Sequence, residues 1–243
     1  MLFRSVPLPV AGIGGVFTAE EYQGQGLASS LMKKCAEEAA KEGAALAFLW
    51  SDKHEFYKKN GFHLLGRQWT MDFQVSHAPF LRRTGEKAEI PGAALRYSDE
   101  VSIELLKQSH ALLEIYPIGI VRSPEEHAMY LSSGSCRVVS AWAGNELAAY
   151  FVIGKGRDLT GYIHEWAGAE GALSHLLAQC LEDFQQPLHL LSPQFMRDEV
   201  PWIYSLEEGG IPFRPEYLAL VKLLNFEKLK KLLDLYLKRL GQN

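Results

Sequence analysis

The sequence predicts an α/β fold with a mixed sheet, because one pattern of elements occurs twice along the chain. In each half an expected strand is followed by a glycine-containing loop, an amphipathic helix and a short apolar strand. The first occurrence is GIGGVFT, YQGQG, LASSLMKKCAEEA and AALAFLW, and the second is GYIHEWA, GAEG, ALSHLLAQCLEDF and PLHLLS. Alternating strands and helices are typical of α/β domains. The repetition predicts two related units in tandem.

In the first half, apolar spacing sets the expected elements. Strands are expected at 2–6, 10–18, 44–50 and 62–75, and helices at 27–41 and 53–59. The apolar stripe of the first helix is formed by Leu31, Met32, Cys35, Ala36 and Ala39. Because it lies on this stripe, Cys35 is expected in the core and not as a nucleophile. The apolar run at 44–50 is too short for a globular helix and suits a buried strand.

The second half carries the clearest local signals. Strands are expected at 93–97, 136–143, 147–154, 160–166 and 188–192, and helices at 99–114, from Ser123 onward and at 170–184. Ser123 followed by Pro124 and two glutamates is a helix start, because serine caps, proline fits the first turn and acids suit the positive end. Gly144-Asn145 predicts a two-residue hairpin turn between two strands.

Composition predicts the domain bounds. Residues 1–76 are expected to form the first unit, 77–92 a linker rich in proline, glycine and charge, 93–220 the second unit and 221–243 a C-terminal amphipathic helix. Leucines and Phe226 line one face of that helix, and lysines and Arg239 line the other. We expect it to pack on the body of the protein. A membrane-surface helix or a partner-docking helix is the alternative.

The bulk composition excludes several classes. The chain has 243 residues, 47% of them hydrophobic and 22% charged, which excludes a disordered protein. A net charge of -4 gives no basic footprint for a nucleic-acid partner. Three cysteines without CxxC spacing, and no His/Cys/Asp cluster, suggest neither a disulfide framework nor a metal site, so a reducing cytoplasm is expected. Pro7 and Pro9 interrupt the apolar N-terminus, and no membrane span is expected.

One segment carries chemistry: Gln23, Gly24, Gln25, Gly26, Leu27, Ala28 and Ser29, between an expected strand and an expected helix. The first turn of a helix has unpaired N–H groups and a partial positive charge. Glycines let the backbone approach a ligand closely. We therefore expect a phosphate cradle, with a pyrophosphate over the N–H groups of 25–29. A glycine-rich turn without a ligand is the alternative, and the spacing fits neither a dinucleotide fingerprint nor a P-loop.

The region 14–61 resembles the GNAT acyltransferase superfamily. The signature Gln/Arg-x-x-Gly-x-Gly/Ala is matched at Gln23, Gly26 and Ala28, and the downstream run LWSDKHEFYKKNGF is similar to the family's fifth strand and fourth helix. GIGGV before the cradle and LW before the tyrosine helix are closest to tandem proteins of the enhanced-intracellular-survival type. In that family two units lie side by side and only the first keeps the cradle. The loop at 168–171 here lacks the signature.

The resemblance implies an N-acetyltransferase that transfers an acetyl group from acetyl-CoA to a primary amine of a small molecule or peptide. It implies that the backbone of Val16, Phe17 and Thr18 pairs with the pantetheine arm, and that an N–H near Val16 or Phe17 polarises the thioester carbonyl. It places Tyr57 near the sulfur as general acid. A tyrosine that only packs is the alternative. The relatives often assemble into oligomers, which implies self-association.

Two departures from the family pattern limit this transfer. A whole unit begins with a strand, two helices and two more strands, of which only residues 2–5 could be a remnant, so the first unit is expected to be incomplete. The family's third domain, which can supply the general base, is expected to be absent. His54, Asp52, Glu21 and Glu165 are then candidate bases, each more typical of a surface or structural group. A non-catalytic acyl-CoA-binding or protein-interaction module, and a longer-chain or aminoacyl donor, are the competing functions.

Overall fold

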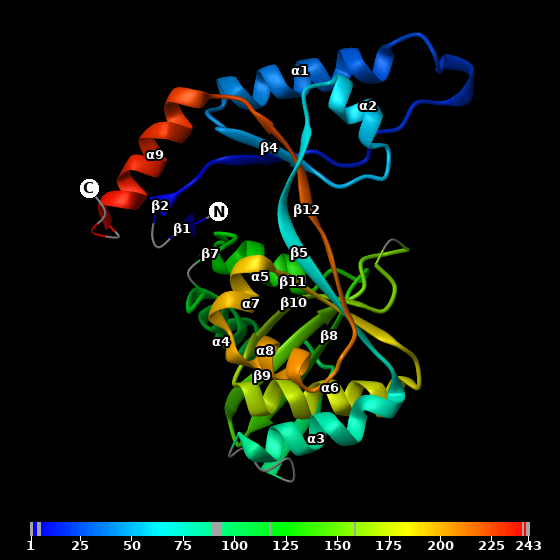
Figure 1. The fold of residues 1–243 in the computed structure, drawn as a ribbon, viewed down its shortest axis with the longest axis vertical. Helices are drawn as coiled ribbons and strands as arrows, with labels where there is room; N and C mark the ends of the chain where they lie inside the picture. The colour runs from blue at the N-terminus through cyan, green and yellow to red at the C-terminus, as the bar shows by residue number, and fades with distance from the viewer. Residues whose placement is uncertain are drawn as a thin grey trace. The chain divides into compact units, whose positions relative to one another are not determined.

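The computed structural model describes residues 2–3, 6–88, 94–116, 118–157, 159–239 and 241. The chain divides into two compact units. Unit 1 contains residues 1–67, 117–121 and 217–243, and unit 2 contains residues 68–116 and 122–216. The units therefore differ from the expected bounds, because the C-terminal segment returns to the first unit (Figure 1).

Unit 1 is built on a strand–helix–strand motif. Strand β3 (Val10–Gly12) runs parallel to β4 (Leu46–Leu49), and helix α1 (Leu27–Lys41) connects them. The parallel pairing requires a crossover, which the helix provides. Strand β3 is much shorter than the expected 10–18. Its last ladder contact is Ile13 N–H to Phe48 O at 2.9 Å, and glycines follow at 14 and 15, with Gly15 at a φ of 66°.

Other elements complete unit 1. They are β1 (Leu2–Phe3), β2 (Val6–Pro7), η1 (Glu20–Tyr22), α2 (His54–Lys59), the first part of β5 (His63–Phe73), β7 (Ile118–Gly119), the later part of β12 (Phe213–Leu223) and α9 (Phe226–Arg239). Strand order in this unit is β3-β4-β12-β5, with a small separate sheet β2-β1-β7. A buried cluster unites α1, β4, α2 and β12 through Met32, Leu49, Tyr57 and Leu220.

Helix α1 presents a different face to this core than its stripe predicts. Met32 and Ala36 are its buried residues, whereas Leu27 and Leu31 are 49% and 53% exposed. Cys35 is also exposed, so the prediction that it lies in the core is wrong. The apolar stripe is broad, so it does not determine which of its residues face the sheet. A single face of the sheet buries only part of the stripe.

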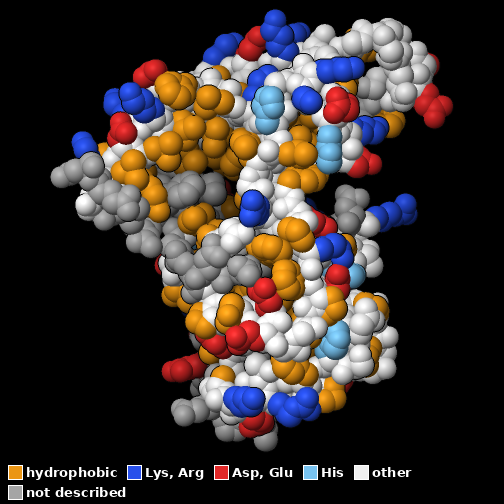
Figure 2. All heavy atoms as spheres, in the orientation of Figure 1, with side chains coloured by type: hydrophobic (Ala, Val, Ile, Leu, Met, Phe, Trp, Pro, Cys, Tyr) orange, Lys and Arg blue, Asp and Glu red, His pale blue; other side chains and the backbone are white. Residues whose placement is uncertain are grey.

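Helix α9 has no buried residue. It lies against β2, and Phe226, Leu233 and Leu237 on its apolar side are 60%, 44% and 41% exposed. Figure 2 shows hydrophobic side chains gathered on this side of unit 1. Lys228 Nζ donates a hydrogen bond to Gly43 O, which ties the start of the helix to the α1–β4 turn. The C-terminal helix expected at 221–243 is observed over Phe226–Arg239. Residues 221–223 belong instead to β12, and residues 240, 242 and 243 lie outside the described residues.

Unit 2 is a sheet with helices on both faces, in the strand order β6-β8-β9-β10-β11-β5. Its strands are β6 (Leu95–Ser98), β8 (Arg137–Ala143), β9 (Glu146–Ile153), β10 (Tyr162–Gly168) and β11 (Leu188–Pro193), joined by residues 68–73 of β5. Its helices are η2 (Val75–His77), α3 (Ala78–Lys87), α4 (Ile103–Glu114), α5 (Pro124–Leu131), α6 (Glu170–Phe184), α7 (Gln194–Glu199) and α8 (Pro201–Glu208).

The core of unit 2 lies on the two faces of this sheet. Val139 and Phe151 belong to the cluster with α6 and α3, whereas their neighbours Val138 and Val152 belong to the cluster with α4. Successive strand residues point to opposite faces, so each strand supplies both clusters. This explains why the strands at 136–143 and 147–154 are almost continuously apolar.

The two units share a motif and a way of completing it. In unit 2, β10 and β11 are parallel and α6 connects them, as α1 connects β3 and β4 in unit 1. In unit 1, β4 pairs antiparallel with residues 220–223 of β12. In unit 2, β11 pairs antiparallel with residues 68–73 of β5. Each motif is thus extended by a strand that lies far from it in the sequence.

The local signals of the second half are confirmed. Ser123 Oγ accepts the N–H of Glu126 at 3.1 Å, and the Glu126 carboxylate accepts the N–H of Ser123 at 2.7 Å, a reciprocal cap for α5. Gly144 has a φ of 62° in the turn between β8 and β9. The helix expected at 99–114 begins at Ile103, because Ser102 Oγ caps it by accepting the N–H of Leu105 at 3.1 Å.

The expected linker at 77–92 is a helix over most of its length. Residues 78–87 form α3, with Pro79 in the first turn, where a missing N–H costs nothing. Leu81 and Gly85 are buried, and the helix packs on α6. Composition suggests a linker because charged residues cover the outer face of α3. The inner face of this helix needs only a few apolar residues to pack on the protein. Residues 89–92 lie outside the described residues.

We predict that Gly168→Ala destabilises unit 2. Gly168 has a φ of 142°, and an added Cβ would lie 2.3 Å from Ala148 O in the neighbouring strand. Backbone strain and overpacking together should lower the free energy of unfolding by about 2–4 kcal/mol. Urea unfolding measures this. Gly134→Ala is the control, because Gly134 has open space around it, and it should cost less than about 0.5 kcal/mol. Equal stability of the two variants would contradict the prediction.

Candidate functional site

The start of helix α1 has the geometry of an anion cradle. Gly24 and Gly26 have φ values of 77° and 74°, and Gly26 is the N-cap residue. No side chain caps the helix, and the first helical hydrogen bond runs from Ser30 N–H to Gly26 O at 3.0 Å. The N–H groups of Leu27, Ala28 and Ser29 therefore remain available at the positive end of the helix dipole. A cradle of this kind can bind phosphate oxygens.

Two glutamines fix the loop before the cradle. Gln23 Nε2 donates to Thr18 O at 3.1 Å, and Gln25 Nε2 donates to Glu21 O at 3.4 Å. Gln23 N–H also donates to Glu20 O at 3.1 Å, which closes the short helix η1. The side chain of the first signature residue, Gln23, therefore stabilises the loop by a hydrogen bond to its backbone.

The segment expected to pair with a pantetheine arm is not a strand. Residues 13–19 form no regular element, Val16 is half-buried against the core cluster of unit 1, and Phe17 is 82% exposed. The expectation of a strand at Val16, Phe17 and Thr18 is therefore wrong in this structure. The physical reason is that β3 pairs with β4 alone within the described residues. A short edge strand that is interrupted by glycines has few hydrogen bonds to continue it.

Tyr57 lies in helix α2 with its ring in the core and its hydroxyl unengaged. It is 7% exposed, and its ring contacts those of Phe56 and Phe62 edge-on at centroid distances of 5.0 and 6.1 Å. Among the described residues the hydroxyl makes no hydrogen bond and is not fully enclosed. A packing tyrosine would gain from a partner for its hydroxyl. The geometry leaves this group able to serve a ligand.

The structure brings the cradle and the tyrosine helix together. Asn60, which ends α2, donates from Nδ2 to Phe56 O at 2.9 Å and to Ser29 Oγ at 3.4 Å. Lys222 on β12 donates to Asn60 O at 2.8 Å. The first turn of α1 and the end of α2 are therefore linked by one side chain. The sequence does not indicate the role of Asn60 and Lys222, because no local pattern shows that Asn60 contacts Ser29 or that Lys222 contacts Asn60.

The candidate general bases separate into two groups. His54 Nε2 lies 3.2 Å from Tyr217 OH, and that hydroxyl donates to Ser51 O at 2.9 Å. His54 thus belongs to a defined contact in unit 1, whereas Asp52 and Glu21 are exposed. Glu165 belongs to unit 2.

Glu165 lies in a buried polar cluster of unit 2. Arg122 Nη1 lies 2.7 Å from its Oε2, and Tyr150 donates to its Oε1 at 3.1 Å. The side chains of Arg122 and Glu165 are only 13% and 11% exposed. The Arg122 guanidinium also lies 4.1 Å from the ring centroid of Tyr130. Such full pairing is what a buried carboxylate needs, and it fits a structural role for Glu165.

The same cluster keeps two histidines neutral. His127 Nε2 lies 2.8 Å from Ser109 Oγ, and burial, with the nearby Arg122 and His110 charges, lowers the pKa of His127 to about 4. Burial also lowers the pKa of His164, whose Nδ1 lies 3.1 Å from Tyr130 OH. Burial and Glu165 raise the pKa of Tyr130 and of Tyr150. The cluster is therefore built for one protonation state at neutral pH.

The corresponding turn of unit 2 offers no cradle. Helix α6 begins at Glu170, directly after Ala169, and Gly171 and Ala172 in its first turn are buried. Ala169 N–H donates to Ala148 O at 2.8 Å, so the turn is closed onto the neighbouring strand. In the part of the chain that the structure describes, no group of His, Cys, Asp and Glu is placed to hold a metal ion. No described helix is long and apolar enough to cross a membrane.

Comparison with known proteins gives a family match for the first segment and supports the fold. Residues 1–65 match the family described as an acetyltransferase (GNAT) domain. No curated protein matches the sequence. The chain is similar to the crystal structure of a GCN5-related N-acetyltransferase from Kribbella flavida, with a TM-score of 0.60 and 18% identity over 93% of this chain and 56% of that chain.

Two further structures address the tandem arrangement. A tandem GNAT protein from the clavulanic acid biosynthesis pathway matches with a TM-score of 0.53 and 12% identity, over 90% of this chain and 76% of that one. Eis1 from Mycobacterium abscessus matches with a TM-score of 0.54 and 14% identity, over 93% and 59%. At these identities the likeness establishes the fold: the predicted mixed α/β fold of GNAT type is confirmed. The chain spans a little over half the length of the first structure.

We predict that His127 makes stability depend on acid pH. The unfolded chain takes up a proton as the pH falls through about 6.5, whereas folded His127 does so only near its pKa of about 4. The stability that its neutral form contributes is therefore complete above pH ~6.5 and is lost as the pH falls toward ~4, by at most about 1.4 kcal/mol per pH unit.

Urea unfolding at about pH 7.5 and about pH 5 measures this loss. In His127→Asn the difference between the two pH values should shrink, whatever its stability at neutral pH. His63→Gln is the control, because His63 is exposed, and it should keep the wild-type difference. An unchanged pH dependence in His127→Asn would show that other groups titrate instead.

Proposed function

We propose that unit 1 binds acetyl-CoA and that the protein transfers the acetyl group to a primary amine of a small molecule or peptide. The observation that carries this proposal is the uncapped N-terminus of α1 behind two left-handed glycines, within a segment that matches the acetyltransferase (GNAT) family. The pyrophosphate would contact the N–H groups of Gln25 to Ser29.

The proposed reaction needs a proton donor for the thiolate and a hydrogen-bond donor for the carbonyl oxygen near the thioester. The amine nitrogen forms a bond to the carbonyl carbon, the C–S bond breaks, the amine loses a proton and the thiolate gains one. Tyr57 OH is the proposed general acid for the thiolate, because it has no hydrogen-bond partner among the described residues. A backbone N–H near Val16 or Phe17 is the proposed donor to the carbonyl oxygen. We assign no general base.

The edge strand β3 of unit 1 is relevant to whether the chain can be active. Within the described residues β3 pairs with β4 alone. In the loop and helix that follow it in the sequence, Phe17, Leu27 and Leu31 are 82%, 49% and 53% exposed. An open edge and exposed apolar side chains favour a further polypeptide segment that covers them. We propose that such a segment completes the amine side of the site. Without it, the chain would act as an acyl-CoA-binding module, which is the competing function.

Calorimetry with acetyl-CoA, CoA and desulfo-CoA, followed by a thiol-release assay over a panel of amines, separates these functions. Binding with amine-dependent thiol release supports the transferase. Binding without release favours the module. The absence of binding at millimolar ligand would overturn both. The net charge of -4 favours cationic amines by long-range attraction, so polyamines and lysine peptides belong in the panel.

We predict that Gly26→Val weakens acetyl-CoA binding at least about tenfold, or ~1.4 kcal/mol. A β-branched residue disfavours the φ of 74° at the cap, so the N–H groups of the first turn should turn away from the phosphate oxygens. Calorimetry measures the affinity. Gly134→Val in unit 2 is the control and should bind as the wild type does. Equal affinity of Gly26→Val and wild type would remove the cradle from the proposal.

We predict that Tyr57→Phe lowers kcat about 10- to 100-fold while acetyl-CoA affinity stays within about twofold, because the change removes only the proton donor. Steady-state thiol release and calorimetry give the two quantities. Tyr22→Phe is the matched control, since Tyr22 is exposed and near the cradle in sequence. Unchanged turnover in Tyr57→Phe would show that this tyrosine only packs.

A further inference from the structure

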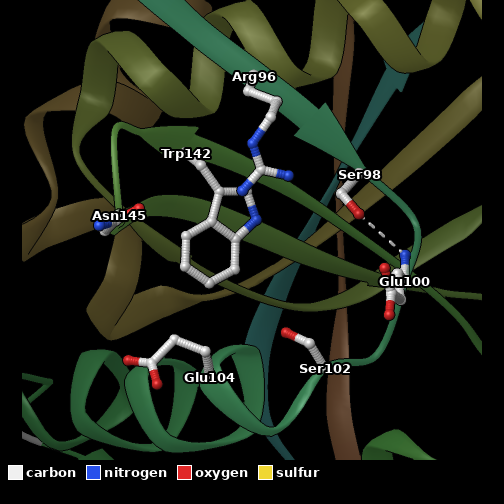
Figure 3. A pocket seen from close by; sticks show the side chains of 7 residues that line it. All are labelled: Arg96, Ser98, Glu100, Ser102, Glu104, Trp142 and Asn145. Atoms are coloured by element: carbon white, nitrogen blue, oxygen red, sulfur yellow. Dashed lines mark hydrogen bonds between the residues drawn. The ribbon is translucent and has the colours of Figure 1, made fainter.

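Unit 2 contains a cavity of about 580 Å³ that the proposed acetyl transfer does not use. Residues of β6, the segment after it, the start of α4, β8 and the β8–β9 turn line it (Figure 3). Its volume is within the range of small-molecule sites. Its lining residues all belong to unit 2, whereas the cradle and Tyr57 belong to unit 1.

An arginine without an acidic partner lies at this cavity. Arg96 Cζ is 5.5 Å from the ring centroid of Trp142, and Figure 3 shows the guanidinium across the indole. Arg96 makes no ion pair with any described side chain. Trp142 is a fixed platform, because it is 5% exposed and its Nε1 donates to Ser140 Oγ at 2.9 Å. Stacking orients the guanidinium and leaves its N–H groups for a planar anion such as a carboxylate.

Two hydroxyl groups and a helix end also favour an anion. Ser98 Oγ accepts the N–H of Glu100 at 3.1 Å, and Ser102 Oγ accepts the N–H of Leu105 at 3.1 Å. Because both oxygens act as acceptors, both hydroxyl hydrogens can donate to a ligand. Ser102 is also the N-cap of α4, so the positive end of that helix lies at the cavity.

Two carboxylates, of Glu100 and Glu104, also line the cavity and can bind a cationic group. Glu104 Oε1 accepts from Gln108 Nε2 at 2.7 Å. Gln108 is itself fixed, because its Nε2 donates to Asn145 O at 3.0 Å and its Oε1 accepts the N–H of Leu147 at 2.7 Å. The Glu104 carboxylate is thus held in place with its second oxygen open. The Glu100 carboxylate also lines the cavity and has no ion-pair partner among the described residues.

We infer that this cavity binds a free α-amino acid, with its carboxylate at Arg96 and the serine hydroxyls and its ammonium at Glu104 and Glu100. A phosphate group would meet two carboxylates against one guanidinium, and a simple amine would leave Arg96 unpaired. A zwitterion satisfies both sets of groups. This site goes beyond the proposed function, and its binding does not depend on acyl-CoA.

Ligand-observed NMR with each of the standard L-α-amino acids at about 20 mM identifies a binder, and titration gives its Kd. The N-acetyl derivative and the methyl ester of that amino acid each remove one charge. We expect both to bind at least tenfold more weakly. Failure of every amino acid to bind, or equal binding of either derivative, would overturn the inference.

Variants connect the binding to these residues. Arg96→Gln and Glu104→Gln should each weaken the amino acid at least tenfold, with unchanged urea unfolding as evidence of folding. Arg83→Gln and Glu114→Gln are matched controls, because both residues are exposed and neither lines the cavity, and both variants should bind as the wild type does. Wild-type affinity in Arg96→Gln, or equal weakening by a control, would overturn the site. Acetyl-CoA binding should be the same in all four variants, which separates this result from the fate of the proposed function.

Discussion

The antiparallel pairing of β12 with β4 and of β5 with β11 is the constraint on which the rest of the structure depends. A parallel pair joined by one helix is too small to bury a core, and each pair here gains its third strand from a distant part of the sequence. In unit 1 that strand supplies Leu220 to the cluster that holds Tyr57, and Lys222 to Asn60. The candidate site therefore depends on residues near the C-terminus, although its motif lies near the N-terminus.

The two units differ in what they do with the same motif. In unit 1 a loop with left-handed glycines precedes the helix and leaves its first N–H groups uncapped. In unit 2 the helix begins directly after Ala169, against the neighbouring strand, and its first turn is buried. A helix end enclosed in the core cannot receive a ligand. The length of the loop, its left-handed glycines and the burial of the first helical turn together distinguish the two units.

The polar cluster around Arg122 and Glu165 in unit 2 is stable because its charges are paired. Removing Arg122 and Glu165 from water is costly, and the cost is offset only because each charge meets the other and further hydrogen-bonding groups. Burial then keeps His127 neutral beside them. A cluster with one acceptable protonation state fixes how α4 and α5 pack on the sheet. Its groups are occupied with one another, whereas Arg96, at the more open cavity of this unit, makes no ion pair with a described side chain.

The sequence by itself determined the mixed α/β fold, the start of α1 directly after the glycines at 24 and 26, the tyrosine helix and the cap of α5. Each depends on local spacing, on glycine or on a capping side chain within a few residues. Only the tertiary structure decided that Cys35 is exposed, that residues 13–19 are irregular and that 78–87 form a packed helix. These outcomes depend on which neighbour covers a surface, and an amphipathic stripe does not specify its partner. The contacts of Asn60 with Ser29 and of Arg122 with Glu165 join residues that are distant in the chain, and nothing in either segment indicates the other.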